Sequence, residues 1–347
     1  MRIITIFFLG VFWINLSIGQ TDTLIRVVAA GDVNLGTSYP STAFLPMTAD
    51  APYFLLEPAK DIIKNATVAF CNLEGSFLNT GIVSKHCRDT MNCYVFKTPE
   101  MYFKCIADVG FNLFSLANNH IYDFGLAGVE STYRLVNSFN LNAAGTTNHS
   151  FCKFEINGVR FGFTAFSPIT GTNNINNYSE VKEIVTLLKL ETDIVIVSFH
   201  GGAEGKNYQH VKKEQEVYLG ENRGDVYAFS KMAIDCGADI VIGHGPHVPR
   251  GLYLYKNRFI AFSLGNFCTY GRINVSGVNG YAPLIDIFIN KKGQFVKGKI
   301  HSFIQDYGSG ISIDSSRRAA LLIRKLSAED FPDSPLEIGE DGSIKLK

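Results

Sequence analysis

Short apolar runs alternate with amphipathic stretches along most of the chain, and this alternation limits the folds open to it. Five runs rich in Val, Ile and Phe are predicted as buried strands, at residues 24–30, 67–73, 111–117, 193–199 and 239–242. Five other stretches have helical periodicity, at residues 52–65, 99–109, 126–139, 179–190 and 225–236. Strands that alternate with helices indicate an α/β fold, in which helices cover the faces of a sheet.

Three hairpins are expected from residue 151 onward. The first turns at Asn157-Gly158, the second at Lys256-Asn257, and the third joins residues 285 and 303 through Lys291-Lys292-Gly293. Parallel strands combined with hairpins predict two packed, mixed sheets in one domain, which we place at residues 24–305. Residues 306–347 are expected to form a helix followed by an irregular tail.

The first nineteen residues have a composition of their own. Met1 and Arg2 precede an apolar run at residues 3–16, and small residues follow at Ser17 and Gly19. This order is typical of a cleaved signal peptide, here residues 1–19, although an uncleaved anchor or a buried first strand has the same composition. Cleavage would leave an exported protein, which is periplasmic, on the cell surface or secreted.

An exported chain can form disulfides, and the chain has seven cysteines. Cys87 and Cys93 are the expected pair, because they lie close together in a polar stretch that little else would hold. Charge excludes one class of partner: with 32 basic and 32 acidic residues, the chain has no basic excess with which to bind nucleic acid.

Each predicted strand ends in a polar cluster. These clusters are residues 31–34, 72–75, 118–120, 200–202 and 243–247. Because the carboxyl ends of strands line the ligand crevice of an α/β sheet, side chains from distant clusters can converge there. Asn, Asp and Gly are also ordinary turn and capping residues, so Asp32 or Asn119 alone would indicate little. Histidines beside an Asp and a Glu are harder to explain in that way.

The clustered side chains are metal ligands by type. The candidate ligands are Asp32, Glu74, Asn119, His200, His244 and His247. Mixed oxygen and nitrogen donors suit Zn, Mn or Fe, and so many donors exceed the needs of one tetrahedral ion. We therefore expect two divalent ions that share a bridging carboxylate. His120 is the candidate catalytic residue, as a general acid or a hydrogen-bond donor to the transition state.

The chain resembles the CapA family, proteins associated with poly-γ-glutamate capsule synthesis, in six short segments. These are GDVNLG (31–36), NLEGS (72–76), SLANNHIYDFG (115–125), HGGAE (200–204), GHGPHVPRG (243–251) and FSLGNF (262–267). The resemblance covers residues 26–303. It implies a fold similar to the calcineurin-like metallophosphoesterases, an α/β/β/α sandwich of two mixed sheets flanked by helices.

The resemblance also implies roles for single residues. Glu74 would take the place of the bridging aspartate, His200 and His244 would serve the same ion as Asn119, and His247 would serve the ion held by Asp32. Residues expected around these ligands or against substrate are Asn34, Asn118, Asp123, Glu204, Lys97 and Arg250. Asp123 and Glu204 would orient imidazoles or remain solvated loop charges. Asn34 stands where the phosphoesterase motif has a histidine, so one metal site loses a strong ligand.

Two kinds of function remain open from the sequence. One is a metal-dependent hydrolase or transferase that acts on an anionic polymer, in poly-γ-glutamate synthesis or export, with a divergent metallophosphoesterase as a variant. The other is a non-catalytic component that binds the polymer in the same cleft. Lys97 and Arg250 would contact carboxylates in either case. Membrane-bound capsule synthesis proteins are further candidate partners.

Overall fold

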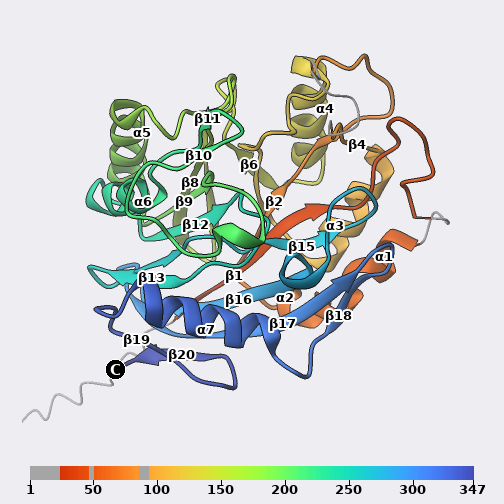
Figure 1. Ribbon diagram of the computed structural model, residues 1–347. Coiled ribbons are helices and arrows are strands. Elements are labelled where there is room, and N and C mark those ends of the chain that lie inside the picture. Colours follow the sequence, from red (N-terminus) through yellow and green to blue (C-terminus); the bar gives the residue numbers. More distant parts are fainter. Residues whose placement is uncertain (1–23, 47–50, 86–93) are drawn as a thin grey trace, which may run out of the picture.

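Two β-sheets pack face to face, with helices on their outer faces (Figure 1). The computed structural model describes residues 24–46, 51–85 and 94–347. The predicted signal peptide, residues 1–19, and the predicted pair Cys87 and Cys93 lie outside these residues. Within the described part of the chain, no helix is both long and apolar enough to cross a membrane.

The larger sheet has a parallel half and an antiparallel half. From β1, neighbouring strands run parallel through β2 and β5 to β6, while β16 and β17 pair antiparallel on the other side. Its strands are β1 (Ile25–Asn34), β2 (Val68–Leu73), β5 (Leu113–Ser115), β6 (Asn142–Ala144), β15 (Asn266–Thr269), β16 (Tyr281–Ile289), β17 (Phe295–Asp306), β18 (Gly310–Ile313), β19 (Leu336–Ile338) and β20 (Ser343–Leu346).

The smaller sheet is also mixed, because hairpins form both of its edges. Parallel strands β8, β9, β12 and β14 lie between the edge strands β7 and β13. The members are β7 (Phe151–Ile156), β8 (Val159–Phe166), β9 (Ile194–His200), β12 (Ile240–His244), β13 (Leu252–Tyr255) and β14 (Arg258–Ala261). Two short pairs stand apart: β3 (Ser76–Phe77) with β4 (Lys97–Thr98), and β10 (Val217–Tyr218) with β11 (Glu221–Asn222).

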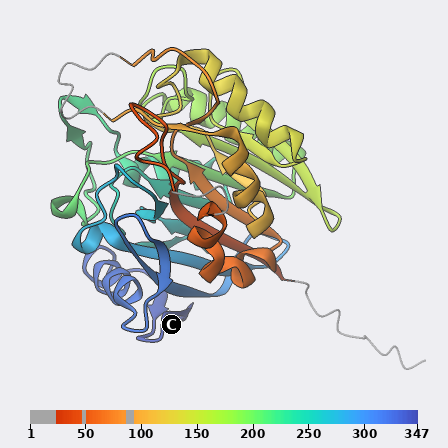
Figure 2. The same ribbon diagram turned by 90° about the vertical axis from the view of Figure 1, so that its right-hand side faces the viewer.

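Helices cover the outside of each sheet. Buried side chains of α1 (Ala51–Leu56), α2 (Lys60–Lys64), α3 (Phe103–Val109) and α4 (Gly125–Ser138) pack on the larger sheet, on the side that Figure 2 faces. Those of α5 (Tyr178–Glu191) and α6 (Val226–Asp235) pack on the smaller sheet. Helix α7 (Arg318–Asp330) lies against β13, β16 and β17. Short 3₁₀ turns are Glu57–Ala59, Glu100–Tyr102, Lys206–Tyr208 and Gly277–Gly280.

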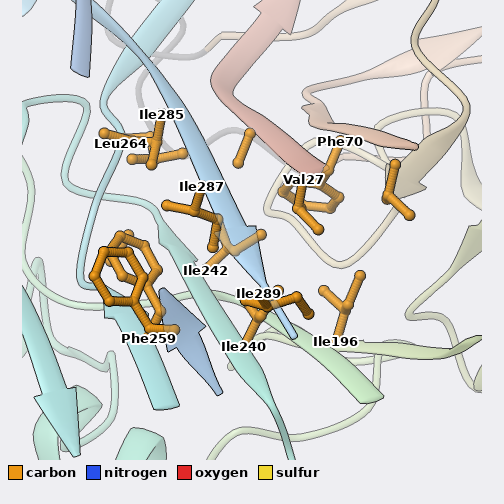
Figure 3. Close-up of a cluster of buried hydrophobic side chains, with 14 of the residues drawn as sticks. Val27, Phe70, Ile196, Ile240, Ile242, Phe259, Leu264, Ile285, Ile287 and Ile289 are labelled. Atoms are coloured by element: carbon orange, nitrogen blue, oxygen red, sulfur yellow. The ribbon is translucent and has the colours of Figure 1, made fainter. Parts of the chain in front are cut away.

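Branched and aromatic side chains fill the space between the two sheets (Figure 3). Ile285 and Ile287 come from the larger sheet, Ile196 and Ile240 from the smaller one, and all of them are buried. Such residues favour strands because a branched side chain packs well on a pleated surface. The inner faces of the two sheets thus form a continuous core that fixes how their strand ends meet.

The sequence predictions of the fold are largely confirmed. The chain has the predicted α/β class, the two mixed sheets and the three hairpins, and Asn157 and Gly158 both have positive φ at the first turn. The predicted helix at 52–65 is wrong as one element, because Pro58 follows α1 and a 3₁₀ turn separates it from α2.

The predicted irregular tail is also wrong. After α7, strand β19 pairs with β20, and β20 pairs with β17 of the larger sheet. Ile344 of β20 is buried in the core between the sheets. Residues beyond 306 therefore extend the larger sheet. The boundary predicted between the domain and the tail, at residue 306, corresponds to the end of β17.

We expect Phe259→Ala to lower the free energy of unfolding by about 3–5 kcal/mol, the usual range for a buried Phe. Phe259 of β14 stacks on Phe295 of β17 with ring centroids 5.6 Å apart, so the pair joins the two sheets. Urea denaturation measures the loss, and Leu190→Ala, at a side chain 80% exposed, is the control. A loss below about 1 kcal/mol would contradict the packing described here.

Candidate metal centre

The predicted ligands meet where strands of both sheets end. Asp32 lies near the end of β1, beside Asn72 of β2 in the backbone register. His200 and His244 are the last residues of β9 and β12 and lie opposite each other. Because these parallel strands end at one edge of the sandwich, residues far apart in the sequence become neighbours.

The remaining candidate ligands lie in the turns that follow the strands. Glu74 comes directly after β2, Asn119 follows β5, and His247 follows β12. His247 has a φ of 55°, an unusual backbone conformation for a residue other than glycine. Its carbonyl oxygen accepts hydrogen bonds from the side-chain amides of Asn266, at 3.4 Å, and Asn279, at 3.2 Å. These two amides support the turn that carries the imidazole.

Glycine at two positions allows the strands to approach closely. A Cβ atom on Gly31 would lie 2.0 Å from the carbonyl oxygen of Gly265, and one on Gly243 would lie 2.3 Å from that of Phe262. The backbone N–H of Asp32 donates to the Gly265 carbonyl at 2.8 Å. The glycine in front of Asp32 is therefore required by packing.

The Asp32 carboxylate lies between two imidazoles. Its Oδ1 is 3.2 Å from Nδ1 of His244, and its Oδ2 is 3.1 Å from Nδ1 of His247. Asn72 also donates to Oδ1 at 2.8 Å. Burial by itself would raise the pKa of Asp32, but the two imidazoles outweigh it and hold that pKa well below its usual range. Asp32 is therefore ionised in the folded protein.

Several buried ligand atoms at this centre have no hydrogen-bond partner among the described residues. They are both carboxylate oxygens of Glu74, both ring nitrogens of His200 and His244, Oδ2 of Asp32 and Oδ1 of Asn119. Buried polar atoms are nearly always satisfied, so a concentration of unpartnered donors and acceptors requires an explanation. His244 Nδ1 approaches Asp32 Oδ1 without hydrogen-bond geometry. Ligand atoms that bind the same metal ion lie close together without forming hydrogen bonds to one another.

A divalent ion fits these residues. Glu74, His200 and His247 each offer a ligand atom, and the three atoms lie within 4.8 Å of one another. Burial holds the pKa of His200 well below its usual range, so its imidazole is neutral, the form that binds metal. Burial raises the pKa of Glu74, His247 opposes the rise and Asp32 adds to it. A cation between these groups would offset the cost of the buried carboxylates.

His247 lies against both carboxylates of the centre. The resemblance implied that His247 serves the ion held by Asp32 and that Glu74 is shared between the two ions. In the structure Nδ1 of His247 faces Asp32, while its Nε2 lies 3.5 Å from Oε1 of Glu74. Burial opposes protonation of His247, but the adjacent carboxylates raise its pKa well above the usual range. His247 is therefore the residue that connects the two carboxylates.

Asn34 and Asn118 organise the turns around the centre. Asn34 donates to the carbonyl oxygen of Glu74 at 2.7 Å and accepts from the N–H of Gly36 at 3.0 Å. Asn118 donates to the carbonyl oxygen of Leu73 at 2.7 Å and accepts from the N–H of His120 at 3.1 Å. Both amides are thus committed to backbone groups, and Asn34 leaves its position without a ligand.

His120 forms a hydrogen-bonded group beside the candidate ligands. Its Nδ1 lies 2.8 Å from Oδ2 of Asp123, and the ring packs on Phe96 with centroids 4.2 Å apart. Asp123 is therefore within hydrogen-bond distance of the imidazole. Lys85 is an addition that the sequence did not single out: its Nζ lies 3.1 Å from Asp123 Oδ1 and 3.2 Å from His120 Nδ1. No local pattern marks Lys85, because its partners are distant in sequence.

The centre opens into a cleft of about 990 Å³. Glu74, Asn119, His120 and His247 lie in its wall, and the charged residues around them are Lys85, Asp123, Glu204, Glu221, Arg223 and Arg272. Acidic and basic groups are therefore mixed. The cleft can hold a ligand with several polar groups next to the candidate ion.

Three predicted site residues have other partners. Glu204 lines the cleft, but its Oε1 accepts from Arg223 at 2.6 Å instead of orienting an imidazole. The Lys97 ammonium lies over the ring of Phe124, 5.6 Å from its centroid, and Lys97 is not in the wall of this cleft. Arg250 is fully buried, so it cannot contact a substrate. The expected substrate contact of Arg250 is therefore wrong, whereas those of Glu204 and Lys97 stay predictions.

Arg250 is instead half of a buried ion pair. Its two terminal nitrogens donate to the two carboxylate oxygens of Glu216, each at 2.8 Å. Its Nε also donates to the carbonyl oxygen of Tyr208 at 2.8 Å. Arginine is suited to such a position because its planar group forms paired hydrogen bonds with a carboxylate. The pair holds the segment around Glu216 against the turn after β12.

The sequence matches a family model over residues 26–270, which include the candidate ligands. The family is described as bacterial capsule synthesis protein PGA_cap. The chain belongs to this family. The capsule biosynthesis protein CapA of Bacillus anthracis is 30% identical to this PGA_cap protein over 183 residues, 47% of this chain and 41% of that protein. The PGA biosynthesis protein CapA of Bacillus subtilis is 24% identical over 266 residues, 71% of this chain and 64% of that protein.

The PGA_cap chain therefore spans between two fifths and two thirds of the length of these relatives. Among solved structures, a putative 5′-nucleotidase from Staphylococcus aureus in complex with alpha-ketoglutarate resembles it with a TM-score of 0.42 and 15% identity. That match covers 88% of this chain and 58% of the other. The likeness is a distant one.

We expect excess Zn²⁺ or Mn²⁺ to stabilise the protein, by about 2.7 kcal/mol at 100 times the dissociation constant. Glu74→Gln and His200→Ala should remove most of this gain, because each loses a ligand atom. His301→Ala is the control, since the imidazole of His301 lies beside Asp286, 3.5 Å away. Thermal unfolding and metal analysis after dialysis give the measurement. Equal stabilisation of all the variants would contradict the assigned ligands.

Arg250→Met should lower the free energy of unfolding by about 3–5 kcal/mol, because it leaves Glu216 buried without its partner. The double variant Arg250→Met, Glu216→Leu should recover most of that loss, since no unpaired charge remains. Urea denaturation of the variants tests both statements. A stable Arg250→Met protein that had lost only ligand binding would restore the earlier interpretation of Arg250 as a substrate contact.

Proposed function

We propose that the protein is an exported, metal-dependent hydrolase or transferase that acts on poly-γ-glutamate or a related anionic polymer. The observation that carries this proposal is the set of buried ligand atoms without a hydrogen-bond partner among the described residues, of which those of Glu74 and Asn119 belong to residues that line an open cleft. Family membership supports a role in capsule polymer synthesis or export. The names of the two Bacillus relatives, which concern capsule and PGA biosynthesis, point the same way.

The residues that would hold the ions are Asp32, Glu74, Asn119, His200, His244 and His247. Two divalent ions, of Zn, Mn or Fe, remain the proposal, with Glu74 shared between them. The side chain of Asn34 is committed to backbone groups, so the ion beside Asp32 would have fewer protein ligands. Divalent ions at such a centre supply Lewis-acid polarisation of an acyl or phosphoryl oxygen and a more acidic water.

His120 is the residue proposed to move a proton. Its Nδ1 is held by Asp123, so Nε2 is the ring nitrogen left for substrate. Burial lowers the pKa of His120, while Asp123 opposes this and Lys85 adds to it. The neutral imidazole is therefore favoured, and His120 would accept a proton at Nε2 before donating one. The sequence suggested only the donor role; the environment of the ring supports both in turn.

The shape of the surface supports a ligand longer than one monomer. A second hollow of about 750 Å³ shares Glu204, Tyr218 and Asn279 with the walls of the cleft. Its other side chains are mostly uncharged, and they include Asn207 and Gln209. Such amides can pair with the amide groups of a polymer backbone, while an ion and Lys85 would attract its carboxylates. The composition of residues 1–19, which is typical of a signal peptide, supports export. Membrane-bound capsule synthesis proteins are the proposed partners.

The test is turnover of γ-linked glutamate oligomers by the metal-loaded protein, beside nitrophenyl phosphoesters. We expect cleavage or transfer of the γ-glutamyl bond, and a 10²–10⁴-fold lower kcat in His120→Ala, because general acid–base catalysis contributes about that factor. His301→Ala is the matched control and should retain activity.

Other outcomes would select between the alternatives. Tight binding of the oligomer without turnover would favour the non-catalytic polymer-binding role. Turnover of phosphoesters alone would favour a divergent metallophosphoesterase. Failure to retain metal in any preparation would contradict a metal-dependent enzyme of either kind.

A further inference from the structure

Strands β10 and β11 form a hairpin, which Figure 1 labels. This hairpin carries an exposed leucine that lines the cleft. Leu219 is 88% exposed and forms the turn with Gly220. Both residues have positive φ, 48° at Leu219 and 81° at Gly220. Two-residue hairpin turns with this backbone favour Asn and Gly, because a larger side chain is strained there. Leu219 therefore has neither a favourable backbone nor a buried side chain.

The position of the hairpin is nevertheless well defined at its base. The N–H of Glu216 donates to the carbonyl oxygen of Gly224 at 3.0 Å, and the N–H of Arg223 donates to that of Glu216 at 2.8 Å. The buried pair of Glu216 with Arg250 holds this base from below. Among the described residues other than its chain neighbours, a Cβ atom on Gly220 would meet no atom within 4 Å, so the tip projects away from them.

The cleft has apolar as well as charged side chains in its walls. Glu74 and His247 belong to the metal centre, whereas Tyr94, Ile273 and Leu219 contribute aromatic and aliphatic surface to the same walls. Tyr94 is 44% exposed. A single exposed leucine is ordinary on a protein surface. An exposed leucine in a strained turn, with other apolar side chains around the same cleft, is a candidate for contact with a ligand.

We infer that Leu219 is a binding residue, which packs on the hydrocarbon part of a polymer chain lying in the cleft. This inference rests on the proposed function and identifies the chemistry of the ligand. In a γ-linked glutamate chain the backbone contains methylene groups between its amides, and the carboxylates branch from it. Such a chain presents hydrocarbon to Leu219 while its carboxylates reach the ions and Lys85. Burial of Leu219 on binding offsets the strain of the free hairpin.

The test substitutes the residue that the turn prefers. Leu219→Asn should keep or raise Tm, because Asn adopts positive φ more readily than Leu. The same variant should bind a γ-glutamate oligomer about tenfold more weakly in calorimetry with the metal-loaded protein, the loss expected for part of one leucine contact. Inorganic phosphate, which reaches the ions but not the rim, should bind the variant and the wild type equally.

Leu190→Asn is the matched control, at another exposed leucine on α5, and it should leave oligomer binding unchanged. A lower Tm in Leu219→Asn would show that the leucine stabilises the hairpin itself and would overturn the inference. Equal oligomer binding by Leu219→Asn and the wild type would overturn it too, while the proposed function would stand. A wild-type protein that binds no oligomer would contradict the proposed function, and the inference would fall with it.

Discussion

The contact on which the rest of the structure depends is the Asp32 carboxylate held between His244 and His247. Asp32 belongs to the larger sheet and His244 to the smaller one, so the contact joins the two sheets at the edge where their strands end. A buried carboxylate is costly unless positive or donating groups surround it. Gly31 and Gly243 permit the close approach that brings those groups within reach. The packing of the two sheets against each other and the choice of residues at the centre therefore depend on each other.

Most of the fold could be predicted because its signals are local. Asn157-Gly158 specifies a hairpin turn by backbone preference alone, and the apolar runs identify strands by composition. The failures concern partners that are distant in sequence or effects that periodicity does not show. Pro58 interrupts a stretch whose apolar spacing is otherwise helical. Strand β20 is short and is stabilised by pairing with β17. The sequence of residues 343–346 does not indicate this pairing.

The candidate site divides in the same way. Ligand types were predictable, because Asp32, Glu74 and the histidines lie at or just after the carboxyl ends of strands, which line the ligand crevice of an α/β sheet. The interaction partners of the side chains around these ligands could not be predicted. Arg250 was predicted to contact substrate, but its partner is Glu216. Lys85 was not singled out, although it contacts the His120 and Asp123 pair. Such pairings depend on which loops lie next to each other in the folded protein. The spacing of residues along the chain does not indicate this.

Balanced net charge has a more specific meaning once the site is known. The chain has as many basic as acidic residues, yet a polyanion must meet positive charge where it binds. Arg223 is engaged by Glu204 and Glu221, and Lys85 by Asp123, so side chains alone give the cleft little excess of positive charge. An ion on the buried carboxylates would change that balance locally. Attraction of an anionic chain should then depend on metal far more than on surface lysines, which links occupancy of the centre to recognition as well as to chemistry.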